Sequence, residues 1–218
     1  MVVNCKEKIM KIIRVIAAGL LLWSASSYAD DDKFSSQTVG LEITKPSSWT
    51  FVTADEYKEN LKRARMNDAE FQEIMQKYAT APLVAMMKYP EPYDDLNPSF
   101  KINIKPLGRL KGIDGKAIVA LILPQFQKLL QDYELVQEPV EKEISGLKAG
   151  YAQLNYTLEI PDGRIFPTTS ELWIIPRGDY YFIIGAGTRQ DEKTGTRSEI
   201  AEILKSLKID NYTVHNNI

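Results

Sequence analysis

The second half of the chain consists of strand-like segments separated by tight turns. Residues 152–160 place an apolar or aromatic side chain at every even position and a polar one at every odd position. This alternation is typical of a strand with one buried face. Strands joined by short glycine-containing turns pair antiparallel, so this half predicts an antiparallel meander. Its strands are expected at Val136–Ile144, Ala152–Ile160, Glu171–Ile175 and Tyr180–Ala186, with turns at Ser145-Gly146, Pro161-Asp162-Gly163 and Arg177-Gly178-Asp179.

The remainder of the chain mixes short strands with signals for helix starts. Strands are expected at Val39–Ile43, Trp49–Phe51, Pro82–Tyr89 and Ser99–Lys105. Capping-box spacing, a threonine with a glutamate three residues later, occurs at Thr53–Glu56 and again at Thr196–Glu199. A further helix should begin at Asn67, and Asp114 can cap a helix in which Pro124 should produce a kink or mark a late start. These elements predict a single α+β domain.

The first 29 residues have the order of a secretory signal peptide. Basic residues precede the apolar run Val15–Trp23, and small residues follow it up to Ala29. The apolar run is shorter than the roughly 20 residues that span a bilayer, although an uncleaved anchor is the alternative. Met10 begins a shorter version of the same signal and is a second candidate start. Cys5 precedes the apolar run, whereas a lipoprotein cysteine would follow it.

Cleavage of residues 1–29 would leave a periplasmic or secreted protein with no stable membrane span. Residues 30–37 are polar and are expected to form a loose lead-in, followed by a single domain over 38–209 and a polar tail over 210–218. The exported protein would contain no cysteine. It must therefore be held together by its core, which at this size buries about 70% of the unfolded surface.

The composition argues against several classes of function. Lys plus Arg number 27 against 29 for Asp plus Glu, so the chain lacks the basic excess that nucleic-acid binding requires. Its one cysteine lies in the signal, and its one histidine, His215, lies in the tail. Thiol catalysis, histidine-based catalysis and histidine- or cysteine-bound metal are therefore not expected. We expect no cofactor, no metal and no enzymatic activity.

Three weaker patterns suggest other functions, each with a simpler interpretation. Gly185-Ala186-Gly187 follows an apolar strand like half of a dinucleotide fingerprint, but Gln190 stands where the third glycine belongs, so a bend is favoured. Glu159 and Glu171 could face each other across a hairpin, as the carboxylates of a hydrolase do, but both are ordinary residues for an exposed strand face. Asp94-Asp95 supplies too few oxygens for calcium and is interpreted as a solvated acidic pair.

The best candidate for a binding surface is the proline-rich loop between two expected strands. Tyr89 and Tyr93 bracket Pro90 and Pro92, and Asp94 and Asp95 follow directly. Aromatic side chains on a stiff loop supply contact area at low entropic cost. We therefore predict that Tyr89, Tyr93, Asp94 and Asp95 form part of a partner-binding surface. In the alternative interpretation, both tyrosines fold onto the core as a lid over the sheet edge.

Short features along the chain resemble those of one known family. They are Lys45-Pro46-Ser47-Ser48-Trp49 after the opening strand, the turn Leu96-Asn97-Pro98-Ser99, and the ending Ile200–Leu207 with Ser206-Leu207. With the order of elements, they resemble the PsbP-like superfamily over residues 38–209. That superfamily includes the extrinsic photosystem II subunit, DcrB-type periplasmic proteins and a eukaryotic Ran-release factor.

The resemblance implies an antiparallel sheet flanked by helices on both faces, an α/β/α sandwich, and a binding or assembly role without chemistry. The metal and docking residues of the photosystem members find no matching motif in this chain, and none is carried over. We therefore predict an exported, non-catalytic protein of the cell envelope that acts through protein–protein contacts with an unknown envelope partner. A carrier of a small apolar ligand, held between helices and sheet, and a carboxylate-based hydrolase are the alternatives.

Overall fold

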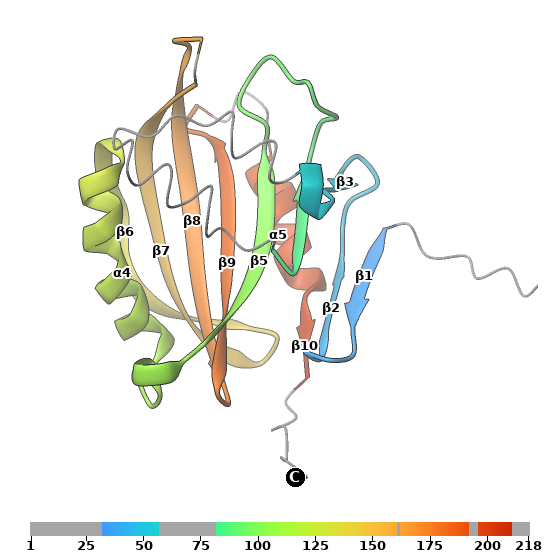
Figure 1. Cartoon of the computed structure of the whole chain (residues 1–218), viewed down its shortest axis with the longest axis vertical. Coiled ribbons are helices and arrows are strands. Elements are labelled where there is room, and N and C mark those ends of the chain that lie inside the picture. Colours follow the sequence, from blue (N-terminus) through green and yellow to red (C-terminus); the bar gives the residue numbers. More distant parts are fainter. Residues whose placement is uncertain (1–31, 57–81, 161, 192–195, 211–218) are drawn as a thin grey trace, which may run out of the picture. The chain divides into compact units, whose positions relative to one another are not determined.

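The alternating segments form most of the larger of two antiparallel sheets (Figure 1). The computed structural model describes residues 32–56, 82–160, 162–191 and 196–210. The larger sheet has the order β3-β4-β5-β9-β8-β7-β6 and the smaller one the order β1-β2-β10. The strands are β1 (Lys33–Ser36), β2 (Leu41–Thr44), β3 (Thr50–Phe51), β4 (Val84–Met87), β5 (Ser99–Pro106), β6 (Gln131–Ile144), β7 (Leu147–Glu159), β8 (Ile165–Arg177), β9 (Tyr180–Arg189) and β10 (Lys208–Ile209). The described helices are α4 (Gly115–Leu129), α5 (Arg197–Ser206) and the 3-10 turn η1 (Gly108–Leu110).

Strand β9 occupies the central position that its apolar run predicted. It pairs with β5 on one side and β8 on the other. Its side chains alternate between two parts of the core: Phe182 and Ile184 pack in one cluster, whereas Tyr181 and Ile183 pack against the other. Because both faces of this strand contact apolar side chains, no polar face is needed, which explains the continuous apolar sequence.

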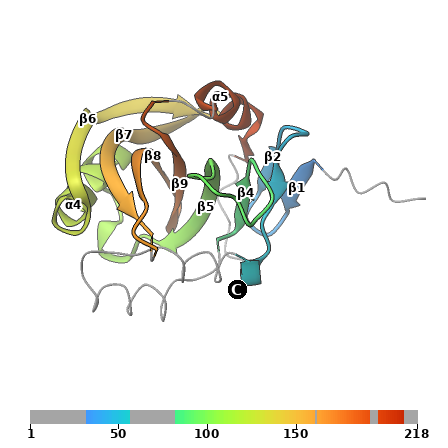
Figure 2. The same cartoon turned by 90° about the horizontal axis from the view of Figure 1, so that it is seen from above.

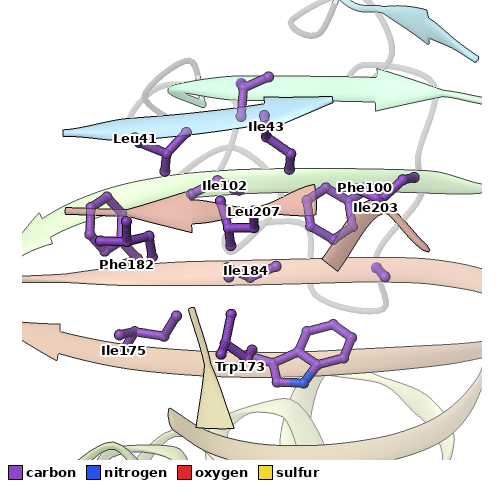
Figure 3. Packing of buried hydrophobic residues seen from close by; sticks show 14 of the residues in the cluster. Leu41, Ile43, Phe100, Ile102, Trp173, Ile175, Phe182, Ile184, Ile203 and Leu207 are labelled. Carbon is purple, nitrogen blue, oxygen red and sulfur yellow. The ribbon is translucent and has the colours of Figure 1, made fainter. Parts of the chain in front are cut away.

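The two clusters of the core contain different helices (Figure 2). Helix α4 packs against β6, β7 and β8, and its buried residues Ile118, Val119 and Leu123 meet those of β7 and β8. Helix α5 contributes Ile200 and Ile203 to the other cluster, together with side chains of β2, β5, β8 and β9 (Figure 3).

The antiparallel sheet is thus confirmed, but the expectation of one sheet is wrong, because β2 pairs with β1 and β10 in a separate sheet. Apolar side chains of β2, Leu41 and Ile43, pack in the same cluster as α5. Helices on both faces remain a prediction. The helix expected to run on from Thr53 and the one expected at Asn67 fall on residues 57–81, outside the described residues.

Helix α4 begins where its cap predicts. A side-chain oxygen of Asp114 accepts a hydrogen bond from the backbone N–H of Ala117 (2.7 Å), and the helix starts at Gly115. Pro124 lies inside the helix, so the expectation of a late start is wrong. Pro124 has no amide hydrogen to donate to the carbonyl of Ala120, but both residues are exposed, so water can bind that carbonyl.

Of the two predicted capping boxes, the one at Thr53 forms and the one at Thr196 does not. Thr53 and Glu56 form the box: the Glu56 carboxylate accepts from the Thr53 N–H (2.8 Å), and the Thr53 hydroxyl accepts from the Glu56 N–H (3.3 Å). Helix α5 does start after Thr196, but its threonine side chain makes no capping bond. Glu199 instead accepts a hydrogen bond from Trp49 Nε1 (3.1 Å) and pairs with Lys88 (2.9 Å). A contact with a distant residue has replaced the local one.

Several further strand expectations need correction. Residues 30–37 were expected to form a loose lead-in, but residues 33–36 form β1, which pairs with β2. Its polar side chains alternate with Phe34, which packs against the core, so one apolar residue suffices to anchor a half-exposed strand. Strands β6, β7 and β8 begin at Gln131, Leu147 and Ile165, ahead of the expected Val136, Ala152 and Glu171. The signal segment over 1–29 and the tail after Asp210, with His215, lie outside the described residues. Within the described ranges, no helix is long and apolar enough to cross a membrane.

Candidate functional site

The proline-rich loop borders a groove whose other wall is the tip of the β7–β8 hairpin. Both segments lie at the same end of the larger sheet (Figure 1). The groove has a volume of about 440 Å³. Its lining residues are Met87, Glu91, Pro92, Tyr93, Asp94, Asp95, Leu96 and Asn97 from the loop side, and Leu158, Ile160, Asp162, Arg164 and Phe166 from the hairpin.

Hydrogen bonds within the loop fix its shape. The backbone N–H of Lys88 donates to the carbonyl of Pro98 (3.0 Å) and closes the loop at its base. Asn97 holds the interior: its amide nitrogen donates to the carbonyl of Tyr89 and to the Glu91 carboxylate, both at 2.8 Å, and its amide oxygen accepts from the Tyr89 N–H (3.1 Å). A loop held in this way loses little conformational entropy when it binds a partner.

Tyr89 and Tyr93 pack on each other. Their rings are stacked, with centroids 4.4 Å apart and planes 18° apart, and both residues are half-buried. Lys88 Nζ lies 5.6 Å from the ring centroid of Tyr89. Neither ring is part of the two apolar clusters among the described residues. Tyr93 lines the groove, whereas Tyr89 supports it from behind. Burial, followed by the neighbouring Tyr89, raises the pKa of the Tyr93 phenol.

The two aspartates of the loop have different surroundings. Asp95 forms an ion pair with Arg189 at the end of β9 (2.7 Å), and both side chains are largely buried. Arg189 also contacts Asp191 (3.0 Å), and its hydrogen bonds to Asp191 and Asp95 raise its pKa. Asp95 therefore anchors the loop to the sheet. Asp94 is exposed, and its backbone carbonyl, rather than its carboxylate, accepts a hydrogen bond from Arg164 Nη1 (2.7 Å).

Arg164 joins the two walls of the groove. Besides its bond to the loop, it forms an ion pair with Asp162 (2.8 Å), and its guanidinium lies 5.8 Å from the ring centroid of Phe166. The backbone N–H of Arg164 donates to Asp162, and this bond, more than the ion pair, lowers the pKa of the Asp162 carboxyl. The sequence predicted the Asp162-Gly163 turn, but nothing in it indicated that the hairpin would meet the loop.

The carboxylate pair of the hydrolase alternative does not form. Glu159 pairs with Ile165 across the hairpin, whereas Glu171 pairs with Gln153. At about 3.3 Å per residue, six residues along β8 separate the two positions by about 20 Å. The Glu171 carboxylate instead accepts a hydrogen bond from the Tyr151 hydroxyl (2.7 Å). Burial and this hydrogen bond raise the pKa of Tyr151.

The dinucleotide and calcium alternatives find no support in the described parts of the chain. Gly185 and Gly187 lie inside β9, which is antiparallel to both of its neighbours, whereas a dinucleotide fingerprint requires a strand–turn–helix unit. Among the described residues, no group of three or more histidine, cysteine, aspartate or glutamate side chains could hold a metal ion.

A second cleft lies between α4 and the edge strand β6. It has a volume of about 420 Å³ and is mostly apolar. Its lining residues are Ala120, Leu123, Pro124 and Gln127 from the helix, and Tyr133, Leu135, Glu138 and Pro139 from the strand. The register of β6 shifts along this stretch, between Gln131 and Val140. Such irregularities bend an edge strand and here accompany the opening of the cleft.

Comparison with known proteins identifies the class of fold. No family model and no curated protein matches the chain. Among solved structures, the chain is similar to the cyanobacterial PsbP of Synechocystis, with a TM-score of 0.50 and 12% identity over 87% of this chain and 99% of that one. The fold is therefore PsbP-like, as the sequence features predicted. At this identity the likeness concerns the fold alone.

Two weaker likenesses are to proteins whose roles differ from each other. One is LpqN, involved in cell envelope biogenesis of Mycobacterium tuberculosis, with a TM-score of 0.47 and 14% identity over 78% of this chain and 82% of that one. The other is the Saccharomyces cerevisiae Ran-binding protein Mog1p, with a TM-score of 0.43 and 9% identity over 81% of this chain and 94% of that one. Neither likeness is strong enough to assign a function.

Proposed function

We propose that this protein is exported and acts, without catalysis, as a binding or assembly protein of the cell envelope. The signal-like order of residues 1–29 supports export. The observation that carries the binding role is the groove between the proline-rich loop and the β7–β8 hairpin. Its rim is polar and its floor apolar, as in surfaces that bind proteins, and its loop is held in shape before any partner arrives.

Site-specific photo-crosslinking tests the groove as the contact surface. A photoreactive side chain at Ile160 lies in the groove, whereas one at Leu121, which is 57% exposed on α4, serves as the control. In cells that produce the protein, we expect Ile160 to form a covalent adduct with one envelope protein and Leu121 to form none with it. Equal adducts at both positions, or none at either, would contradict the proposal.

The two tyrosines provide a second test of the same surface. Replacing Tyr89 and Tyr93 with alanine removes the stack beside the groove and should reduce the Ile160 adduct while leaving the melting temperature nearly unchanged. Early unfolding of the double variant would instead make the rings part of the core. Crosslinking and thermal unfolding should therefore be measured on the same preparations.

Export has its own test. Intact-mass measurement of protein recovered from the periplasm or the medium should show a chain that begins at Asp30. Retention of the apolar run Val15–Trp23 in that material would contradict cleavage and favour the membrane-anchor alternative.

The α4–β6 cleft favours a second candidate function, the carrier of a small apolar ligand. Its volume lies in the range of small-molecule sites, and Leu123, Tyr133 and Leu135 line it. A ligand that binds only the folded protein raises the melting temperature by mass action. Decanoate, used as the probe, should therefore raise the melting temperature of the wild type but not that of Leu135→Gln. No rise in the wild type would argue against a carrier of this kind.

A further inference from the structure

The groove carries an excess of negative charge. Four of its lining residues are acids, Glu91, Asp94, Asp95 and Asp162, and a single lining residue, Arg164, is basic. Arg189 lies behind the lining and pairs with Asp95, but it also pairs with Asp191 outside the groove. Counting both arginines and Asp191, the acids still outnumber the bases. A bound partner segment with positive charge would therefore meet a complementary field.

The acids are not equally engaged. Asp95 and Asp162 each have an arginine within 3 Å. Glu91 accepts hydrogen bonds from the amide of Asn97 and the backbone N–H of Tyr93, so these bonds hold its carboxylate beside the groove. Asp94 stands at the outer end of the loop, exposed, and only its backbone carbonyl is used to hold the loop. Its carboxylate is the one placed to meet a partner.

The floor between these acids is apolar. Tyr93 and Leu96 come from the loop side, and Leu158, Ile160 and Phe166 from the hairpin. An inserted apolar side chain would be removed from water by this floor, and its burial would provide affinity that charge alone does not.

We infer that the groove binds a segment of a partner protein in which an apolar side chain stands next to a lysine or arginine, the apolar group on the floor and the cation beside Asp94. This inference rests on the proposed function and adds the chemistry of the partner. A bare metal ion fits less well, because no cluster of ligand side chains exists in the described residues and the floor is apolar. A neutral apolar molecule would leave the exposed Asp94 carboxylate outside the interaction.

Two matched synthetic peptides test the inference on the full chain. The first is a capped hexapeptide of alternating leucine and lysine, and the second has glutamate in place of lysine. Binding is measured by isothermal titration at low salt. The lysine peptide should bind, and added salt should lower its affinity by screening the charges. The glutamate peptide should bind at least about tenfold more weakly, because like charges face each other. Equal binding of the two peptides would overturn the inference.

Substitution of the rim acid locates the interaction. Asp94→Asn keeps the size of the side chain and removes its charge. It should lower the affinity for the lysine peptide about two- to fivefold, which corresponds to the loss of one exposed ion pair. Glu202→Gln, at an exposed position on α5, is the matched control and should change nothing. An equal loss in both variants would mean that only net charge matters, and this result would overturn the proposed site.

The Ile160 crosslink separates the failure of this inference from the failure of the proposed function. If a partner is crosslinked through the groove but the affinity of the lysine peptide does not depend on Asp94, the partner chemistry is wrong and the binding role stands. If the lysine peptide binds through Asp94 but no partner is crosslinked in cells, the surface chemistry is right and the envelope role fails. Displacement of the peptide by equimolar calcium would identify a metal site and overturn the inference.

Discussion

Helix α4 rests on β7 at a contact between two glycines, and this contact makes a sharp prediction. A Cβ atom on Gly150 would lie 2.1 Å from the carbonyl carbon of Gly115 and 2.3 Å from the backbone nitrogen of Lys116. A Cβ on Gly115 would lie 2.3 Å from the carbonyl oxygen of Ile174. Since every atom within 3.0 Å of either Cβ position belongs to the backbone, no rotamer change can relieve the overlap. Gly150→Ala must therefore displace the start of the helix.

The size of the effect follows from that displacement. Ordinary contact begins at 3.4 Å, so the first turn of α4 has to move outward by about 1.3 Å. A gap of about 0.5–1 Å already forfeits a quarter to a half of the dispersion energy of the atoms that face it. Ile118 and Val119, both fully buried in the next turn, would lose part of their packing. Overpacking typically costs about 1–3 kcal/mol, and here we expect about 3 kcal/mol.

Urea unfolding followed by tryptophan fluorescence measures this loss. Gly178→Ala is the control: Gly178 has φ +60° with nothing within 4 Å of its Cβ position, so it tests backbone strain without overlap. We expect the control to lose about 1 kcal/mol. A Gly150→Ala protein as stable as the control would refute the reasoning, because the helix would then have moved without cost. Failure of Gly150→Ala to fold, with a folded control, would agree with it.

Three further predictions concern single side chains. Trp173→Ala should cost about 3–5 kcal/mol in urea unfolding, because the ring is buried; a loss under about 1 kcal/mol would contradict this. Glu199→Ala should cost about 1–3 kcal/mol by leaving Trp49 Nε1–H without its acceptor, and Glu199→Gln should cost less; equal losses would be contrary evidence. Because the pKa of Tyr151 is raised in the folded protein, this tyrosine stabilises the fold below pH 10, and the stabilisation is lost as the pH rises above 10. Tyr151→Phe should therefore reduce the loss of unfolding free energy at alkaline pH; an unchanged pH profile would exclude this role.

The meander could be predicted from the sequence because its information is local. Alternation along residues 152–160 gives a strand whatever lies around it, and a glycine at a turn such as Gly146, with φ +74°, permits the hairpin without outside help. The continuous apolar run of β9 likewise predicts a central position in the sheet without information from other segments. The cap of α4 also depended only on residues within one turn, Asp114 and Ala117.

Predictions failed where a distant residue competes for a local signal. Thr196 and Glu199 have the spacing of a capping box, but Glu199 contacts Trp49 and Lys88, both far away in the sequence. The register of a hairpin is a second example. Without knowledge of the register, Glu159 and Glu171 could be expected to lie opposite each other, but in the structure a six-residue offset along β8 separates the two positions. Spacing alone cannot reveal which long-range contact replaces a local one.

In the candidate site, one wall of the groove could be predicted from the sequence and the other could not. The loop wall, with Tyr93 and Asp94, could be found from composition, since prolines and tyrosines on a polar background indicate a stiff exposed loop. The hairpin wall could not, because Leu158 and Ile160 continue the alternation of an ordinary strand. The two segments are joined by a long-range hydrogen bond from Arg164 Nη1 to the carbonyl of Asp94, across 70 positions of sequence. A carbonyl acceptor belongs to every residue, so no residue type could have signalled the contact.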